Sequence, residues 1–332
     1  MHAYRMVSLR MALVVLLVVL IVPGVAPAQQ TPQRVIVTFE SGMAETARGR
    51  MAGVGARLEA DLPFVGAAAY TLPAGMTLSR VRALPGVAHV EVDGIVHALK
   101  RTPTQPAEQL PWGVDTIKAD LAWSTTTGDL MWPATGDTVK VAVLDTGIDV
   151  THPDLVANLK GGYSAVSYTS SYTDDNGHGT HVAGTIAAVD NTVGVIGVAP
   201  SADLYAVKVL NRRGSGYTSD IIEGIQWAVA NGIDVINMSL GSSVYELALD
   251  TACTNAIAAG VTIVASAGNS GPDEETVGYP AKYPGVIGVS ATDANNLIAS
   301  FSSRGEGVDI AAPGVSIYST YKKQSYTTMS GT

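Results

Sequence analysis

Three residues of this sequence have the side chains and the surroundings that acyl-transfer chemistry uses. Asp145 ends one apolar run, Asn269 follows another, and His178 lies in a glycine-rich turn. An imidazole titrates near neutral pH, so His178 is suited to carry a proton. A carboxylate such as Asp145 can orient and stabilise the imidazolium, and the side-chain amide of Asn269 can donate to an oxyanion. With a nucleophile added, these groups predict hydrolysis of an amide.

Each residue also has an ordinary structural interpretation. An Asp after a strand commonly caps a turn or a helix, and a His in a glycine-rich turn is usually structural. An Asn in the string Gly-Asn-Ser-Gly, as at Asn269, ordinarily forms a turn. The three patterns occur together, however, and each is linked to a predicted strand or helix. Their joint occurrence favours the catalytic interpretation.

The elements around these residues predict an α/β fold. Short apolar strands alternate with helical patterns, which is typical of βαβ units and of a mostly parallel central sheet with helices on both faces. The predicted strands are residues 139–144, 203–209, 233–236, 261–265 and 286–290, and the predicted helices are residues 179–188, 218–230 and 246–259. Asp145 and Asn269 each follow a strand, so both should lie at the carboxyl edge of the sheet, where ligands bind.

Three segments resemble the catalytic blocks of the subtilisin-like serine peptidases, in the same order. They are Val139–Asp149, Asp175–Thr185 and Val261–Gly271. The resemblance covers residues 111–332 closely and residues 34–99 loosely. It implies a serine endopeptidase in which Asp145 orients His178 and Asn269 stabilises the oxyanion.

The nucleophile of that family is the serine of Gly-Thr-Ser followed by Met-Ala or Ala-Ala. This sequence ends with Ser330-Gly331-Thr332, so we expect the chain to stop one residue before its nucleophile and to be inactive as it stands. Ser330 is a second candidate, but it would act three residues out of register with the glycine turn. A non-catalytic pseudopeptidase or peptide-binding module is the alternative function.

Other chemistries have weaker support in the sequence. His181 lies one helical turn after His178, but there is no His-Glu-x-x-His and no evident third ligand for zinc. Cys253 is the only cysteine and has no basic neighbour close in sequence, so we interpret it as a buried apolar residue. No Gly-x-Ser-x-Gly follows a strand and no Gly-x-Gly-x-x-Gly occurs. These observations argue against an α/β-hydrolase esterase and against dinucleotide binding.

The N-terminus has the pattern of an export signal. Arg5 and Arg10 precede an apolar stretch of residues 11–22, and Ala-Pro-Ala at 26–28 is a small-residue cleavage site. Twelve apolar residues are few for a membrane span. We therefore expect a signal peptide at residues 1–28, a secreted, extracellular protein and no stable membrane anchor.

The next segment, residues 29–106, predicts a small α+β domain that leads into an exposed linker. Its expected elements are strands at Arg34–Phe39, Ala67–Leu72 and Ala88–Val92, helices at Ala44–Met51 and Leu78–Ala83, and a linker at Lys100–Gln109. This domain resembles the inhibitory propeptide of subtilisins, mainly at Val87–Glu91 and in the tail His97–Leu99. We expect a self-processing zymogen that is cleaved between residues 99 and 107, with an incomplete peptidase domain at residues 107–332.

Charge is distributed unevenly along the chain. Residues 1–106 contain 10 basic and 6 acidic residues, whereas residues 107–332 contain 10 and 23. An acidic main body argues against nucleic acid as a partner, since phosphate binding needs a basic face. The asymmetry suits a basic N-terminal segment that docks on an acidic body, although solubility alone also explains an acidic surface.

The resemblance further implies a groove whose two edges pair with an extended peptide by β-augmentation. The expected edge residues are Gly214, Ser215, Gly216, Ser239, Leu240 and Gly241. Gly278 would form the floor of a roomy first specificity pocket that accepts large apolar side chains. The partners that we expect are peptide or protein substrates and the chain's own propeptide, and we expect a monomer.

Calcium is the expected metal, because the segment Val189–Val195 resembles the high-affinity calcium loop of the family. Oxygen ligands at irregular spacing suit Ca²⁺ better than zinc. The expected ligands are the side chains of Glu108, Asp154 and Asn191 and the backbone carbonyls of Val189, Val193 and Val195. A surface loop without a metal is the alternative.

Overall fold

The computed structural model describes residues 33–98, 110–124, 135–191 and 193–332. The predicted signal peptide at residues 1–28 and the predicted linker Lys100–Gln109 therefore lie outside the described residues. Within the described residues, none of the helices combines the length and the apolar character that crossing a bilayer requires.

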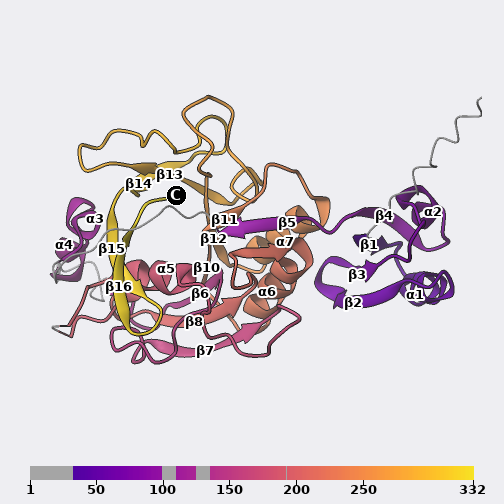
Figure 1. Ribbon diagram of the computed structural model, residues 1–332, viewed down its shortest axis with the longest axis horizontal. Helices are drawn as coiled ribbons and strands as arrows, with labels where there is room; N and C mark the ends of the chain where they lie inside the picture. The colour runs from indigo at the N-terminus through magenta and orange to yellow at the C-terminus, as the bar shows by residue number, and fades with distance from the viewer. Residues whose placement is uncertain (1–32, 99–109, 125–134, 192) are drawn as a thin grey trace, which may run out of the picture.

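A seven-stranded sheet forms the centre of the larger domain (Figure 1). Its strands lie in the order β14-β13-β12-β10-β6-β8-β7, and each neighbouring pair is parallel. The strands are β6 (Lys140–Asp145), β7 (Leu159–Ser164), β8 (Asp203–Lys208), β10 (Val235–Met238), β12 (Thr262–Ser266), β13 (Ile287–Thr292) and β14 (Ile310–Pro313). The predicted α/β class with a parallel central sheet is confirmed.

Helices cover both faces of this sheet. Successive strand residues point to opposite faces, so alternate residues of one strand contact different helices. In β6, Val141 and Val143 share a core with buried residues of α5 (His178–Ala187). The alternate residues Ala142 and Leu144 share the second core with α6 (Thr218–Ala230) and α7 (Leu247–Ala258). The end of β6 is therefore held from both sides.

The observed boundaries lie within two residues of the predicted ones, and α6 covers the predicted residues 218–230. Asp145 is the last residue of β6 rather than the residue after it. The sequence analysis missed two strands of the central sheet, β14 and β7, and the Lys-Gly-Gly segment of β7 has no strand pattern. It also missed the antiparallel hairpin of β15 (Ile317–Tyr321) and β16 (Ser325–Met329). Two short helices, α3 (Trp112–Thr116) and α4 (Ala119–Ser124), precede β6.

The N-terminal module has its own sheet and its own core. Its sheet has the order β2-β3-β1-β4 with antiparallel pairs, and two helices cover it. The elements are β1 (Arg34–Phe39), α1 (Ala44–Gly53), β2 (Arg57–Leu62), the 3-10 turn η1 (Pro63–Val65), β3 (Ala67–Thr71), α2 (Leu78–Arg82) and β4 (Val87–Val92). Only β2 and η1 were not predicted, because β2 alternates charged and small residues without an apolar face.

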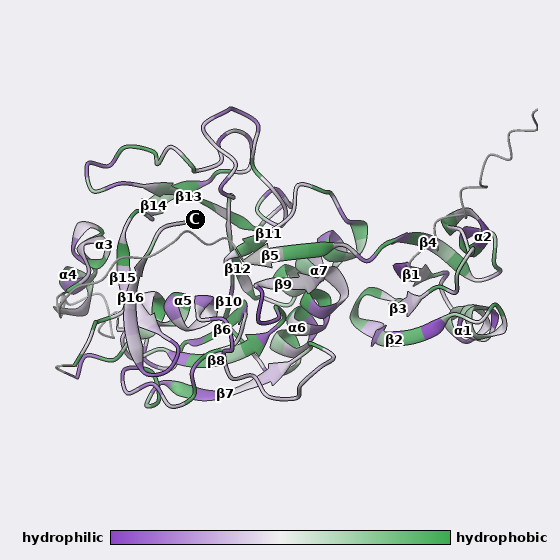
Figure 2. Ribbon diagram, viewed as in Figure 1, coloured by the Kyte–Doolittle hydropathy of each residue, from purple (hydrophilic) through white to green (hydrophobic). Residues whose placement is uncertain are grey.

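The chain leaves this module as an extended strand that joins the larger domain. This strand, β5 (Ile95–Ala98), lies between β9 (Ser215–Tyr217) and β11 (Leu240–Gly241) and pairs antiparallel with both. Figure 1 shows β5 reaching from the module to the edge of the central sheet. Figure 2 shows that it is mainly apolar. The sequence analysis predicted no strand here, although the resemblance to a propeptide implied that the tail near Leu99 occupies the groove until self-cleavage.

Two carboxylates of the module contact the N-termini of helices in the larger domain. Asp93 accepts from the backbone amide of Ser219 at 2.9 Å in the first turn of α6, and it is paired with Arg34 at 2.6 Å. Glu91 accepts from the amides of Leu247 and Ala248 at 3.0 and 2.9 Å at the start of α7. Each carboxylate satisfies amides that a helix leaves unpaired and interacts favourably with the helix dipole.

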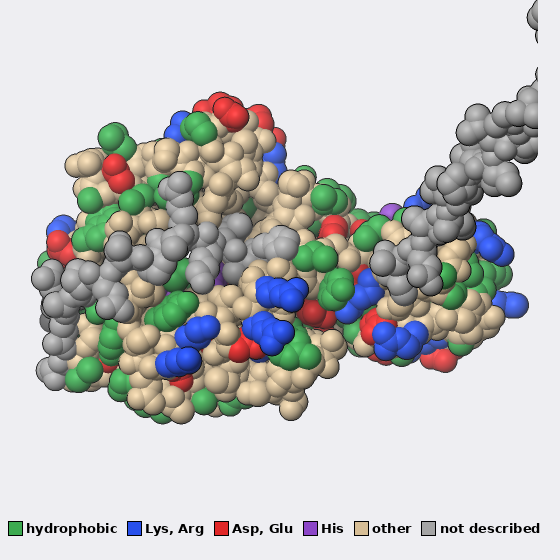
Figure 3. All heavy atoms as spheres, in the orientation of Figure 1, with side chains coloured by type: hydrophobic (Ala, Val, Ile, Leu, Met, Phe, Trp, Pro, Cys, Tyr) green, Lys and Arg blue, Asp and Glu red, His purple; other side chains and the backbone are tan. Residues whose placement is uncertain are grey.

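Charge complementarity is therefore local to these contacts. Figure 3 shows acidic and basic side chains mixed on the visible face of both domains, without one sign confined to each. Glu246, next to α7, is also buried in this interface, and the ideal Cβ position of Gly94 lies 2.0 Å from its Oε1. Burial, together with the nearby carboxylates of Glu91 and Asp93, raises the pKa of Glu246 to about 7 against the lowering effect of a hydrogen bond with Thr218.

Raising the pH from 5 to 8 should destabilise the folded chain through Glu246. A carboxyl with a raised pKa binds more protons in the folded state, so stability falls as the pH rises from about 4.5 to about 7 and then levels off. Glu246→Gln should remove about 1–2 kcal/mol of this loss, since one pKa unit corresponds to about 1.4 kcal/mol and solvent screening reduces it. Urea titration at both pH values measures the free energy of unfolding.

The exposed Glu274 provides the control, because Glu274→Gln should leave the pH dependence as it is in the parent chain. An equal loss of stability from pH 5 to 8 in Glu246→Gln and in the parent chain would show that Glu246 is not the group responsible.

Candidate active site

The structure brings Asp145 and His178 into direct contact. Nδ1 of His178 lies 2.8 Å from both carboxylate oxygens of Asp145. The exposed fractions are 0% for Asp145 and 4% for His178. Asp145 also accepts a hydrogen bond of 2.7 Å from the backbone amide of Thr146. The carboxylate is thus fixed on two sides and shielded from water, which strengthens its interaction with the ring.

Glycines allow the helix that carries His178 to approach the end of β6. Gly177 precedes His178 at φ +112°, a left-handed conformation that side chains rarely adopt. A Cβ on Gly179 would lie 2.2 Å from the carbonyl oxygen of Gly147 and 3.1 Å from Cβ of Asp145. Only the absence of a side chain at Gly179 therefore permits the observed spacing between α5 and the end of β6.

His181 and Cys253 both have structural surroundings among the described residues. Nε2 of His181 lies 3.0 Å from the carbonyl oxygen of Ile317, and burial lowers the pKa of His181 to about 4, so the ring is neutral. Cys253 belongs to α7 and is fully buried in the core, as the sequence analysis expected, and burial raises the pKa of its thiol far above neutral pH.

Asn269 contacts Thr332, the C-terminal residue of the chain. Its Oδ1 accepts from the hydroxyl of Thr332 at 3.2 Å, and the same hydroxyl accepts from the amide of Gly268 at 3.1 Å. His178, Ser239 and Thr332 line one cavity of about 180 Å³. Asp145, His178, Asn269 and the end of the described chain are therefore gathered at one edge of the sheet.

Ser330 also lines that cavity, but its hydroxyl has a structural partner. Oγ of Ser330 accepts a hydrogen bond of 2.8 Å from the backbone amide of Ser316. The contact ties the chain just after β16 to the residue before β15, which gives Ser330 a structural role.

The two predicted groove edges are the strands that flank β5. Ser215 and Gly216 belong to β9, and Leu240 and Gly241 belong to β11. A Cβ on Gly216 would lie 2.1 Å from the carbonyl oxygen of Val209, so this edge needs glycine. The flanking residues Gly214 and Ser239 precede the two edge strands, and Gly214 adopts φ +75° in the turn before β9.

A second pocket opens beside Asn269. It has a volume of about 330 Å³, and Gly241, Gly268, Asn269 and Gly278 are among its lining residues. A Cβ on Gly278 would lie 2.8 Å from the carbonyl oxygen of Ser242, so a side chain there would disturb the neighbouring strand end. The pocket adjoins the groove edge that β11 forms.

Comparison with known proteins decides the family. The model of the subtilase family matches residues 136–332. The chain belongs to this family. It is 45% identical to subtilisin E from Bacillus subtilis over 314 residues, which cover 92% of this chain and 78% of that protein. It is 52% identical to subtilisin DY from Bacillus licheniformis over 228 residues, 68% of this chain and 80% of that protein.

An alkaline protease from Shouchella clausii is also similar, with 48% identity over 248 residues, 75% of this chain and 60% of that protein. The chain is therefore a subtilisin-like serine peptidase, as the resemblance of its three segments implied. In the subtilase fold described above, the matched region contains the whole parallel sheet and both edges of the groove.

The loop expected to bind calcium lies against Asp154. The buried carboxylate of Asp154 accepts from Nδ2 of Asn191 at 3.1 Å, from the amide of Val195 at 2.9 Å and from the hydroxyl of Tyr326 at 2.9 Å. The amide of Val189 donates to the carbonyl oxygen of Asp154.

Asn191, one of the predicted ligands, does not direct its side-chain oxygen towards Asp154. The amide of Val193 donates to Oδ1 of Asn191 at 2.9 Å, so the nitrogen of Asn191 rather than its oxygen faces Asp154. Glu108 lies outside the described residues. Among the described residues, no group of three or more His, Cys, Asp or Glu side chains has the arrangement of a metal site.

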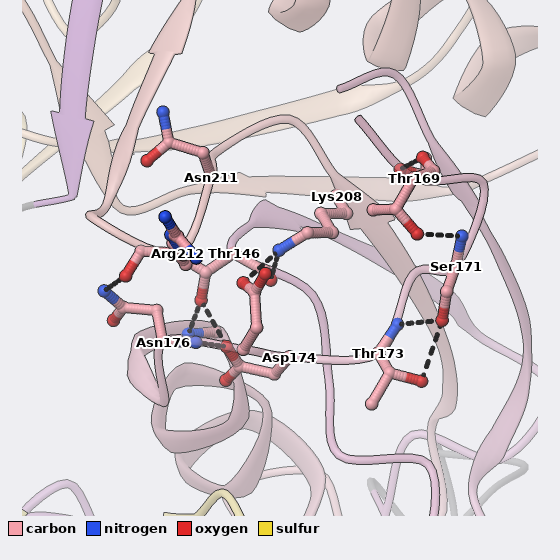
Figure 4. A network of polar contacts seen from close by, with 12 residues as sticks. Thr146, Thr169, Ser171, Thr173, Asp174, Asn176, Lys208, Asn211 and Arg212 are labelled. Atoms are coloured by element: carbon pink, nitrogen blue, oxygen red, sulfur yellow. Dashed lines mark hydrogen bonds and ion pairs between the residues drawn. The ribbon is translucent and has the colours of Figure 1, made fainter. Parts of the chain in front are cut away.

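Two residues that position the pair were missed by the sequence analysis. The hydroxyl of Thr146 accepts from the amide of Gly179 and donates to Asp174, both at 2.9 Å. Asp174 in turn accepts from the amides of Asn176 and Gly177 at 2.8 Å (Figure 4). The only signal in the sequence is a polar turn before His178, which is common to many loops.

Replacing Gly179 by alanine should destabilise the domain by about 1–3 kcal/mol, a range typical of overpacked sites. The new methyl would meet the carbonyl oxygen of Gly147 at 2.2 Å, and backbone atoms cannot give way cheaply. Gly161→Ala is the matched control, since its Cβ would make only an ordinary contact of 3.8 Å with Tyr205. Urea titration measures both changes, and equal effects of the two substitutions would contradict the close approach of α5 to β6.

Proposed function

We propose that this chain is the precursor of a secreted serine endopeptidase whose acid–base pair is Asp145 and His178. The nucleophile in this proposal is a serine at the position that follows Thr332 in the family motif. The observation that carries the proposal is the buried contact of 2.8 Å between Nδ1 of His178 and the carboxylate of Asp145. Thr332 lines the same cavity as His178, which supports a nucleophile delivered there.

The mechanism follows from these positions. Nε2 of His178 takes the hydroxyl proton as the serine oxygen attacks the peptide carbonyl. Asp145 accepts a hydrogen bond from Nδ1–H of His178, which fixes the tautomer, and it stabilises the imidazolium. The side-chain amide of Asn269 donates to the oxyanion of the tetrahedral intermediate. His178 then gives its proton to the leaving amine, and a water molecule hydrolyses the acyl-enzyme by the same steps.

The N-terminal module is proposed to be an inhibitory propeptide. Its strand β5 completes a three-stranded sheet with β9 and β11, which is the arrangement expected of a bound peptide. The register sets Val96 opposite Gly216, His97 opposite Ser215 and Gly241, and Ala98 opposite Leu240. While β5 holds these positions, a substrate cannot pair with the same edges.

The register also suggests where the precursor is cut. β5 ends with Ala98 opposite Leu240, and Ser239, the residue before Leu240, lines the cavity that contains His178. We therefore assign self-cleavage to the bond between Leu99 and Lys100, which lies outside the described residues. Leucine at this position agrees with the roomy pocket that includes Gly278.

The buried side chain of Val96 suggests a second apolar preference. Val96 is 1% exposed and belongs to the same apolar cluster as Leu240 and Ile221. Substrates with a leucine-sized residue before the scissile bond and an aliphatic residue three positions earlier should therefore bind best.

Calcium binding near Asp154 is the proposed stabilising feature. The described hydrogen-bond partners of this fully buried carboxylate are all neutral, and a buried carboxylate without a positive partner fits a cation. Carboxylate, amide and carbonyl oxygens are the donors that Ca²⁺ prefers, and ligation by Asn191 requires its amide to turn. Glu108, Val189, Val193 and Val195 would complete the set, and a bound ion would tie the loop to the core.

Extending the chain after Thr332 with Ser-Met-Ala and with the C-terminal residues that follow this motif in the family should create peptidase activity. The extended chain should cut itself after Leu99 and then hydrolyse peptides with leucine before the scissile bond, whereas the 332-residue polypeptide should do neither. Intact-mass spectrometry measures self-cleavage and a chromogenic peptide measures turnover. In the extended chain Asp145→Asn should lower kcat about 10⁴-fold, because the ring loses its correct tautomer.

The controls distinguish the peptidase from the pseudopeptidase. Asn269→Ala should lower kcat by about 10²–10³-fold, a magnitude known from subtilisin itself. An extended chain that folds, binds peptides and shows no turnover would favour the peptide-binding module. Turnover by the 332-residue polypeptide that Asp145→Asn abolishes would refute the assigned nucleophile.

Removing calcium with a chelator should lower the melting temperature by about 5–10 °C. A ligand at a hundredfold excess over its Kd stabilises by about 2.7 kcal/mol, and about 2–4 °C corresponds to each kcal/mol in a domain of this size. Asp154→Asn should abolish the response, and the exposed Asp190→Asn in the same loop should retain it. Scanning calorimetry with and without chelator provides the measurement, and an unchanged melting temperature in the parent chain would exclude the site.

A further inference from the structure

Lys208 is a fully buried lysine that the proposed mechanism does not use. It is the last residue of β8, and its Cα lies opposite that of Asp145 in the parallel pair of β6 and β8. Its exposed fraction is 0%. Removing an ammonium group from water is costly unless it is paired and hydrogen-bonded, so the partners of Lys208 indicate what it is for.

The ammonium group of Lys208 joins the two segments that carry the acid–base pair. Nζ donates at 2.6 Å to the carbonyl oxygen of Thr146, the residue after Asp145. It also donates at 2.6 Å to Oδ1 of Asp175, three residues before His178. Figure 4 shows Lys208 reaching from its strand towards Thr146 and the turn that begins α5. One side chain therefore bridges the end of β6 and the start of α5.

The partner of Lys208 is held in the charged form. Burial raises the pKa of Asp175, but hydrogen bonds from Lys208 and Tyr168 outweigh it, and the pKa lies below its ordinary value. The Tyr168 hydroxyl donates to Oδ2 of Asp175 at 2.8 Å, and its ring centre lies 5.9 Å from Nζ of Lys208. In this ion pair the side chain of Lys208 is fully buried, whereas that of Asp175 is 37% exposed.

Stability alone does not explain this arrangement. A methionine would fill the same buried space, and replacing a buried ion pair by apolar side chains is often neutral or stabilising. Two directed hydrogen bonds, in contrast, fix the relative position of the segments that they join. The amide of Thr146 donates to Oδ1 of Asp145 at 2.7 Å, so any movement of Thr146 reaches the carboxylate directly.

We infer that Lys208 is a positioning residue, which sets the distance and the angle of the hydrogen bond between Asp145 and His178 by holding Thr146 and Asp175 together. The inference rests on the proposed function in that it assigns catalytic use to this pair. Its test does not depend on turnover, because the hydrogen bond exists in the 332-residue chain. Failure of the proposed function and failure of the positioning role are therefore separate outcomes.

The test follows the Nδ1 proton of His178 by NMR in the full 332-residue chain with ¹⁵N-labelled histidine. His178→Gln identifies the resonance by its loss. In Lys208→Met this proton should exchange with water about tenfold faster than in the parent chain, the size expected when one ordinary hydrogen bond is loosened. Lys208→Arg keeps the charge and the donors, and should restore exchange close to the parent rate.

A second lysine supplies the matched control. Nζ of Lys322 donates to the backbone carbonyl of Asp175 at 3.0 Å but does not reach the segment of Thr146 in the described contacts. Lys322→Met should therefore leave the exchange rate of the His178 proton unchanged. A Lys208→Met chain with a lowered urea midpoint and unchanged exchange would reduce Lys208 to a stabilising residue and overturn the inference.

A further variant decides the question if Lys208→Met does not fold. Asp175→Asn leaves the ammonium bound to Thr146 and weakens only its link to the turn before His178. Because Asp175 is partly exposed, this chain should fold, and the His178 proton should again exchange faster than in the parent chain. Unchanged exchange in Asp175→Asn would also overturn the inference.

Discussion

The structure depends on a hydrogen bond between two buried side chains, Asp145 and His178, which the surrounding elements must hold at a fixed distance. A carboxylate without exposure to solvent is costly unless it is fully hydrogen-bonded. The end of a parallel strand supplies the fixed position, and glycines at the start of α5 permit the ring to reach it. The polar network around Thr146 and Asp174 then holds both segments in place.

The proposed peptide groove and the proposed acid–base pair share the carboxyl edge of the central sheet. Strands β6, β10 and β12 run parallel, so their carboxyl ends lie on one side, where Ser239, the residue before the edge strand β11, lines the cavity. The second edge strand, β9, lies on the other side of β5. β5 from the N-terminal module already fills the gap between these edges. The carboxylates of that module are placed at the amino ends of α6 and α7, so docking uses groups that the helices leave unpaired.

Much of this could be predicted from the sequence because its signals are local. The apolar strands, α6 and the strings around Asp145, His178 and Asn269 depend on short-range patterns, and their order fixes the shared edge. The pairing of β5 with β9 and β11 and the contacts of Lys208 could not be predicted from local patterns, since both depend on residues distant in sequence that the fold brings together. The glycine-rich β7 was missed because its pairing with β8, rather than its own composition, makes it a strand.

The most direct test of the account is a double-mutant cycle between Asp145 and His178 in the 332-residue chain. The free energy of unfolding at pH 7 is measured by urea titration for the parent chain, Asp145→Ala, His178→Ala and the double variant. The account predicts a favourable coupling of about 0.5–3 kcal/mol, as found for residues in direct contact. Additive effects of the two substitutions would mean that the side chains do not interact and would contradict it.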